Sequence, residues 1–313
     1  MSDFDFTKPQ VPQPASPDGF DFTKPPPPEG SAGFKPAHSQ YYNADVARKL
    51  FQASGREEHF EAGQHLFVEA EKAVKGGLFS GKSASRMYFI AAGEVALTIG
   101  GRALDTIKSP EIVGEMAVIS ELPRSATATA KVAVRAYSLN AAELQSALAK
   151  TPEFALMLMS VMFDRLRFIA ARLATRKTAT PAGVRESSVF DPVLLQQFEK
   201  ALARAAIMRY QAGASIMREG QAGIYMYVVK SGQVVIAIRD KVVEVVNPGG
   251  TFGEMALVDQ SPRVANATAH VYSELLTVDR ASLLEAVKAQ PAFAMAMLRA
   301  VTERLRHMNS QLG

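Results

Sequence analysis

The sequence of 313 residues contains no cysteine. Disulfide bonds, thiolate catalysis, iron–sulfur clusters and zinc held by cysteine are therefore all excluded. Apolar runs are also short, and none approaches the ~18 residues that a membrane-spanning helix needs. The first ten residues, MSDFDFTKPQ, lack the basic region and the apolar segment of a secretory signal. From these absences we expect a cytoplasmic protein without a membrane span.

A strong excess of charge is missing as well. The 35 Lys and Arg residues are nearly balanced by 31 Asp and Glu residues, so the composition does not demand a nucleic-acid partner, which would need a concentrated basic stripe. A basic face runs from Arg165-Leu166-Arg167 through Arg172, Arg176 and Lys177. Asp164 interrupts it, and we interpret it as a solvated helix face and not as a DNA-binding surface. The five histidines show no metal-ligand spacing, so we expect no metal site.

Proline, by contrast, is concentrated at one end of the chain. Nine of the 17 prolines lie in residues 1–36, and we expect residues 1–40 to form a disordered tail. The unit Phe-Asp-Phe-Thr-Lys-Pro occurs twice there, at residues 4–9 and 20–25. It is either an unselected duplication or a bivalent docking peptide for an unidentified protein. The anchors of such a peptide would be Phe4, Phe6, Phe20 and Phe22.

A larger repeat occupies the rest of the chain. A shift of 139 residues aligns Gly114-Glu115-Met116-Ala117 with Gly253-Glu254-Met255-Ala256, and it holds without a gap over about 80 residues. The first copy carries an insertion within residues 70–86. The repeat predicts two homologous domains, residues 41–178 and 186–313, joined by a linker of residues 179–185.

Each copy has the same predicted order of elements. Short β-rich runs such as residues 225–229 and 233–238 come first, separated by turn signals. A helical stretch closes each copy, at residues 153–174 and 292–312. This order predicts a mainly β fold with flanking helices: two double-stranded β-helix (jelly-roll) barrels, each closed by C-terminal helices. A core of that size is feasible because 48% of the residues are hydrophobic.

The densest matches between the copies follow the pattern Gly-Glu-Met-Ala-x5-Pro-Arg-x-Ala-x-Ala. In both copies the arginine stands nine positions after the glutamate. This segment resembles the phosphate-binding cassette of the cyclic-nucleotide-binding domain family. Catabolite-activator-type regulators and the regulatory subunits of cAMP-dependent protein kinase belong to that family. The resemblance covers nearly all of residues 55–310 and implies that the ligand is cAMP or cGMP.

The residue types of the motif suit such a ligand. An arginine fork matches two phosphate oxygens, and an ionised glutamate, which only accepts, fits a ribose hydroxyl. The resemblance thus implies that Arg124 and Arg263 hold the phosphate, while Glu115 and Glu254 take the 2′-hydroxyl. The other candidate ligand-binding residues flank these four, at a helix start or where small side chains let the backbone approach: Gly114, Met116, Ala117, Ser125, Ala126, Gly253, Met255, Ala256, Val264 and Ala265.

Base preference depends on few residues. Ser125 follows the first arginine and can contact a guanine or the phosphate, whereas Val264 follows the second and offers no such bond. Asn309 is the neutral amide in the closing helix, near where the family's base contacts lie. We therefore favour cAMP over cGMP. The first site is the less complete, because residues 109–112 replace the glycine turn at residues 247–250.

No output domain is recognisable in the sequence. The chain has no helix-turn-helix, channel or cyclase effector and no arginine-pair pseudosubstrate. We expect a non-enzymatic sensor or adaptor whose output passes through a separate protein. The alternative is a scaffold or cargo protein, with structural barrels that hold no nucleotide and a tether in the repeated tail unit. Nucleotide bound to the purified protein would distinguish the two.

Overall fold

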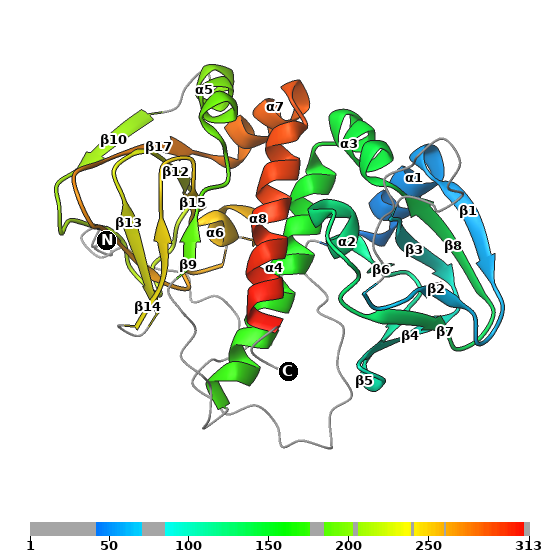
Figure 1. The fold of residues 1–313 in the computed structure, drawn as a ribbon. Coiled ribbons are helices and arrows are strands. Elements are labelled where there is room, and N and C mark those ends of the chain that lie inside the picture. The colour runs from blue at the N-terminus through cyan, green and yellow to red at the C-terminus, as the bar shows by residue number, and fades with distance from the viewer. Residues whose placement is uncertain are drawn as a thin grey trace, which may run out of the picture.

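The structure is a computed structural model, and it describes residues 42–70, 85–175, 185–202, 206–238, 241–259 and 261–309 (Figure 1). The repeated tail unit, insertion residues 71–84 and linker residues 179–184 lie outside the described residues. We call residues 42–175 the first domain and residues 185–309 the second domain.

The first domain contains two four-stranded sheets. Their strand orders are β1–β8–β3–β6 and β2–β7–β4–β5, and every pair of neighbours is antiparallel. The strands are β1 (Arg56–Phe60), β2 (His65–Phe67), β3 (Met87–Ala92), β4 (Glu94–Ile99), β5 (Arg102–Lys108), β6 (Ile112–Val113), β7 (Thr127–Ala130) and β8 (Val134–Leu139). The helices are α1 (Ala44–Ser54), α2 (Glu115–Ser120), α3 (Ala141–Lys150) and α4 (Glu153–Thr175).

The second domain repeats both strand orders, as β10–β17–β12–β15 and β11–β16–β13–β14–β9. The strands are β9 (Arg185–Ser187), β10 (Ala206–Tyr210), β11 (Ser215–Met217), β12 (Met226–Ser231), β13 (Val234–Ile238), β14 (Lys241–Val246), β15 (Thr251–Phe252), β16 (Asn266–Ala269) and β17 (Ser273–Val278). The helices are α5 (Pro192–Ala201), α6 (Glu254–Asp259), α7 (Arg280–Ala289) and α8 (Ala292–Asn309). The prediction of a mainly β fold with flanking helices is confirmed.

The second domain has one strand more than the repeat predicts. Strand β9 pairs in parallel with β14, with Arg185 opposite Glu244. The sequence predicts that Arg185 belongs to the linker, because residues 185–187 show no apolar alternation and therefore give no strand signal. The chain therefore joins the second pair of sheets before its first helix begins.

Strand β7 illustrates how the sequence forms the sheets. Its residues alternate between threonine and alanine, and Ala128 and Ala130 are fully buried. Successive side chains of a strand point to opposite faces of the sheet. The alanines therefore point into the core between the two sheets of the first domain, where they pack with Val95. Strand β16 repeats the pattern in the second domain.

Polar side chains fix where the C-terminal helices begin. Asn140 caps α3 by accepting from the backbone of Glu143 at 2.9 Å, while the Glu143 carboxylate accepts from the backbone of Asn140 at 2.8 Å. Asp279 caps α7 by accepting from the backbone of Ser282 at 2.7 Å. Such caps each stabilise a helix by about 1 kcal/mol. Because α3 and α7 directly precede α4 and α8, these caps help to position the closing helices.

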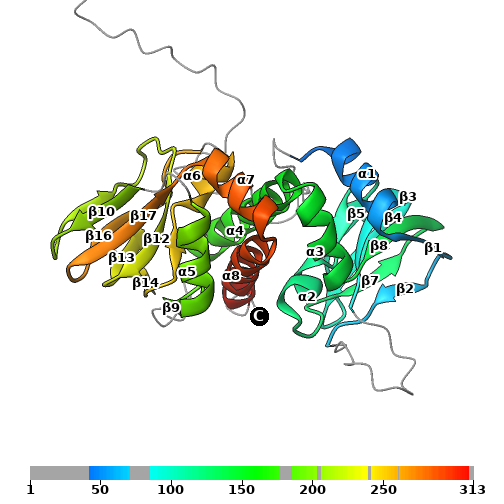
Figure 2. The same ribbon diagram turned by 90° about the horizontal axis from the view of Figure 1, so that it is seen from above.

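Helices α4 and α8 lie side by side between the two groups of strands (Figure 1). The largest hydrophobic core combines buried residues of both domains, including Phe154 and Phe163 on α4 and Phe293 and Leu305 on α8. Each pair of sheets has a smaller core of its own. Seen from above, the helices form a band between the strands of the two domains (Figure 2). The two domains thus share one helical core.

Among the described residues, no helix is long and apolar enough to cross a membrane.

Candidate functional site

Each copy of the motif places a glycine immediately before a short helix. Gly114 precedes α2 with φ of +82°, and Gly253 precedes α6 with φ of +79°, a region that favours glycine. A side chain at either position would also come too close to its neighbours. A Cβ on Gly253 would lie 2.5 Å from Nη1 of Arg263, and a Cβ on Gly114 would lie 2.8 Å from the ring of Phe67. The glycine lets the start of the helix approach the arginine of the motif.

The two motif arginines are held in the same way. Arg263 donates from Nη1 to the carbonyl of Gly253 at 2.8 Å and from Nη2 to the carbonyl of Tyr225 at 2.6 Å. Arg124 donates from Nη1 to the carbonyl of Gly114 at 2.9 Å and from Nη2 to that of Arg86 at 2.7 Å. Both arginines are only 6–7% exposed. Each domain therefore holds a guanidinium in a fixed orientation beside the start of its short helix.

Aromatic rings flank both guanidinium groups. Cζ of Arg124 lies 4.2 Å from the centre of the Phe67 ring, and Cζ of Arg263 lies 5.7 Å from the centre of the Tyr227 ring. Both distances are within cation–π range. Burial lowers the pKa of Arg263, but an arginine stays protonated at neutral pH. Each site thus holds a buried positive charge.

Glu254 of the second domain is 5% exposed and carries the opposite charge. Thr251 Oγ1 and Arg304 Nη1 both donate to its Oε1, each at 2.8 Å. Burial acts to raise the pKa of Glu254. The charge and hydrogen bond of Arg304, together with hydrogen bonds from the Glu254 backbone and Thr251, outweigh burial, so the pKa lies below its ordinary value. Glu254 is therefore an ionised acceptor at neutral pH.

Glu115, at the equivalent position of the first domain, is 2% exposed. Arg165 on α4 donates to its Oε1. A second carboxylate stands close to each closing-helix arginine. Arg304 Nη2 donates to Glu244 at 3.3 Å. Asp105, which aligns with Glu244, lies near Arg165, and burial raises the pKa of Asp105. In both domains the closing helix thus supplies the counter-charge of the motif glutamate.

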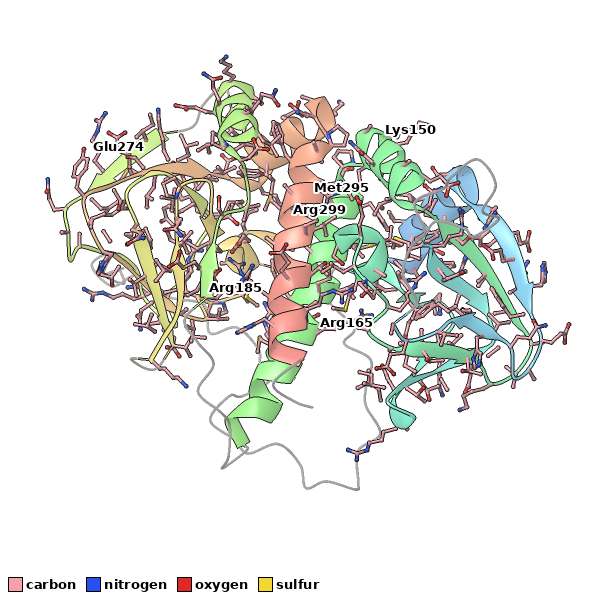
Figure 3. All side chains as sticks on the ribbon, in the orientation of Figure 1. Lys150, Arg165, Arg185, Glu274, Met295 and Arg299 are labelled. Atoms are coloured by element: carbon pink, nitrogen blue, oxygen red, sulfur yellow. The ribbon has the colours of Figure 1, made fainter. Side chains whose placement is uncertain are left out.

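Our interpretation of the basic face of the first closing helix as solvated is wrong for Arg165 and Arg167. The side chains of Arg172, Arg176 and Lys177 lie outside the described residues. Arg165 bonds Glu115, and Arg167 Nη2 donates to Ser261 of the second domain at 3.1 Å. The cause is the position of α4, which packs between the domains (Figure 1). Figure 3 shows Arg165 and Arg185 on opposite sides of the α4–α8 pair. The sequence holds one signal of this pairing, because the closing-helix arginine stands 50 positions after the motif glutamate in both copies.

The remaining candidate residues gather around the two short helices. Ser125 Oγ lies 4.0 Å from the sulfur of Met116, and Met255 and Val264 are partly buried. The four alanines expected to allow close backbone approach are buried: Ala117, Ala126, Ala256 and Ala265. Asn309 is the last residue of α8, but its side chain lies outside the described residues. Its assignment to the base stays a prediction.

No group of three or more His, Cys, Asp or Glu side chains in the described part of the chain could hold a metal ion.

The sequence also matches a known family. The sequence model of the cyclic nucleotide-binding domain matches residues 78–151 and 207–290, slightly more than half of the chain. The chain belongs to the cyclic nucleotide-binding domain family. Each matched segment includes one motif, and the resemblance inferred from the repeated motif is confirmed. The chain therefore carries two domains of this family in tandem.

Relatives within the family have different outputs. A cGMP-dependent protein kinase of Eimeria tenella is 26% identical over 201 residues, 64% of this chain and 18% of the kinase. A CRP-like cAMP-activated global transcriptional regulator of Mycobacterium tuberculosis is 28% identical over 109 residues, 33% of this chain and 49% of the regulator. The chain thus spans less than half the length of either. The catabolite activator protein of Thermus thermophilus matches with a TM-score of 0.37 and 28% identity, over 40% of this chain and 62% of that one.

Proposed function

We propose that this protein is a non-enzymatic cyclic-nucleotide sensor with one binding site in each domain, site A around Arg124 and site B around Arg263. The observation that carries the proposal is the repeated pair of a buried arginine and a buried glutamate at the start of a short helix. An arginine beside two backbone carbonyls offers charge and hydrogen-bond donors to an anion. A cyclic nucleotide presents one phosphate charge together with a ribose hydroxyl, which suits both members of the pair.

The proposed roles follow from the hydrogen bonds. A guanidinium has five N–H donors, of which Arg263 uses two on the carbonyls of Gly253 and Tyr225. We assign its other donors to the equatorial phosphate oxygens. Thr251 and Arg304 both donate to Oε1 of Glu254, so we assign Oε2 to the ribose 2′-hydroxyl. Arg124 and Glu115 take the same roles in site A.

We propose cAMP as the preferred ligand of site B. Val264 follows the phosphate-binding arginine there and offers no hydroxyl to a guanine, while Ser125 in site A can contact either base or the phosphate. The relatives include both cGMP-dependent kinases and a cAMP-activated regulator. The ratio of the cAMP affinity to the cGMP affinity, measured in a variant that retains only site B, tests this proposal.

A scaffold or cargo function without nucleotide is the second candidate. The observation that favours it is that Arg165 and Arg304 already pair with Glu115 and Glu254. Ion pairs of this kind occur in proteins without any ligand. Denaturing the purified protein and analysing the released small molecules by mass spectrometry distinguishes the two. Co-purified cyclic nucleotide supports the sensor.

Thermal unfolding with added ligand tests the sensor directly. A ligand at one hundred times its dissociation constant stabilises the folded state by about 2.7 kcal/mol. We expect cAMP or cGMP to raise the melting temperature by several degrees. No shift and no calorimetric heat with either nucleotide at millimolar concentration would leave the scaffold as the better account.

We further propose that the output passes through a separate protein, docked by the repeated tail unit. Phe4 and Phe6 in the first unit, and Phe20 and Phe22 in the second, are the proposed anchors. Two weak anchors on one chain bind more tightly than either alone because the second binds at a high effective concentration.

A further inference from the structure

Helix α8 belongs to the second domain but donates hydrogen bonds to the first. Arg299 donates from Nε to the carbonyl of Ile119 at 3.1 Å and from Nη2 to the carboxylate of Glu121 at 2.8 Å. Arg306 donates from Nη2 to the carbonyl of Pro123 at 2.8 Å. These acceptors lie in the five residues that run from the end of α2 to Arg124.

The geometry of α8 separates its two roles. Arg299 and Arg306 are seven residues apart, which is two helical turns, so they lie on the same face of the helix. Arg304 lies on a different face and donates to Glu254 of site B. The same helix therefore borders both nucleotide sites. Figure 3 shows Arg299 on α8, where this helix lies against α4.

The dependence is symmetrical only in part. Arg167 on α4, which aligns with Arg306, donates to Ser261 in the segment that precedes Arg263, whereas Arg299 has no arginine counterpart on α4. Arg280 on α7 donates from Nη1 to the carbonyl of Val258 at 2.9 Å, so an arginine of the second domain caps its own short helix, α6. The residue that aligns with Arg280 in the first domain is Ala141, which has no such donor. Instead, Arg299 caps α2 across the domain boundary. On α4, Ser160 aligns with Arg299, and its hydroxyl donates to Met157 on its own helix.

We propose that α8 of the second domain is a positioning element for site A, in which Arg299 and Arg306 hold the segment that presents Arg124 to the nucleotide phosphate. The unmet carbonyls at the end of a helix need donors, and a charged donor holds them more firmly than a neutral one. Arg124 follows Pro123 directly, so a shift of this segment moves the phosphate-binding arginine. The proposal rests on the proposed function.

The experiment isolates each site in the full chain. Arg263→Ala removes the proposed phosphate-binding arginine of site B, and we call this variant the site A parent. Arg124→Ala removes that of site A, and we call this variant the site B parent. The double change Arg299→Ala with Arg306→Ala is added to each parent, and binding of cAMP and cGMP is measured by isothermal titration calorimetry. The matched control is Arg280→Ala, which removes the arginine of α7 that caps α6.

In the site A parent we expect the double change to weaken cyclic-nucleotide binding about tenfold, which corresponds to the loss of about one charge-assisted hydrogen bond. Arg280→Ala should leave this affinity unchanged. In the site B parent we expect Arg280→Ala to weaken binding and the double change to leave the affinity unchanged. A positioning role also predicts that the loss is specific to the phosphate. The affinity for adenosine or guanosine, which lack it, should change less than twofold.

Two results would overturn the inference while leaving the proposed function intact. One is an unchanged affinity of site A in the double variant, and the other is an equal loss for nucleotide and nucleoside. If the double variant does not fold, Arg306→Lys gives the same readout, since a lysine keeps the charge but changes the geometry of the bond to Pro123. If the site A parent binds neither nucleotide, the proposed function fails at site A, and the inference fails with it.

Discussion

At the scale of single residues, Arg124 and Arg263 each place a positive charge beside two backbone carbonyls. Carbonyl dipoles orient a guanidinium, but they do not neutralise it, and burial lowers the pKa of Arg263. We propose that a bound phosphate supplies the negative charge beside each guanidinium, and that these two side chains contribute most of the ligand's binding free energy.

Arg263→Ala should abolish binding at site B. Removing one partner of a buried charge pair costs about 2–5 kcal/mol, which is at least a thirtyfold loss of affinity. Isothermal titration of an Arg124→Ala parent, in which only site B binds, provides the measurement. Arg218→Ala is the matched control, because Arg218 is an exposed arginine of the same domain. Equal affinities in the Arg263→Ala and Arg218→Ala variants would contradict the assignment of the phosphate.

Glu254→Ala should weaken the binding of a ribonucleotide more than that of its 2′-deoxy analogue, because only the ribonucleotide donates a hydrogen bond to the carboxylate. The expected difference is about 1.5–3 kcal/mol, the range for a hydrogen bond to a charged group. Competition titration with cAMP and 2′-deoxy-cAMP measures it. An identical loss for the two ligands would refute the assignment of Glu254 to the ribose.

Acid should destabilise the second domain through the same residue. The pKa of Glu254 is lower in the folded state than its ordinary value of 4.5. A group with a lowered folded pKa stabilises the fold fully above its unfolded pKa. This stabilisation is lost as the pH falls below 4.5 through the folded value. Melting temperatures measured between pH 7 and pH 3 should therefore fall less steeply for Glu254→Gln than for the natural sequence, and parallel curves would contradict this.

At the scale of elements, the start of each short helix depends on a glycine that meets two demands. Gly253→Ala should destabilise the protein by about 1–2 kcal/mol from backbone strain and by a further 1–3 kcal/mol from overpacking against Arg263. Gly213→Ala is the control that separates them, because Gly213 has φ of +80° but a Cβ there would meet nothing within 4 Å. Chemical denaturation should show the larger loss for Gly253→Ala. Equal losses would show that strain alone explains the glycine.

The repeat made much of the fold and the site predictable at this scale. Equal spacing of Gly253, Glu254 and Arg263 with their counterparts predicted one cassette in each domain. The roles of Arg299 and Arg306 were not predictable, because residues on one helix give no information about which neighbouring domain they face. Strand β9 was missed for a related reason. Its three residues are all polar and form a strand because they pair with the edge of β14.

At the scale of the whole molecule, we expect the shared helical core and the tail to make separate contributions. Replacing Phe4, Phe6, Phe20 and Phe22 by alanine should leave the melting temperature and the nucleotide affinity unchanged, because the core and the two sites that the structure describes are formed by residues from 42 onward. It should remove a partner protein that the natural chain retains in a pull-down. Changing one unit alone should cost less than half of that retention. Unchanged co-purifying proteins after all four changes would reduce the repeat to an unselected duplication.

The most direct test of the central claim is the number of nucleotides that one chain binds. Isothermal titration of the full chain with cAMP and with cGMP should give two bound nucleotides per chain for the natural sequence. It should give one for either Arg124→Ala or Arg263→Ala and none for the double variant, with all four proteins folded by circular dichroism. Binding that persists in the double variant, or its absence from the natural sequence, would contradict the claim that the two buried arginines hold cyclic nucleotide.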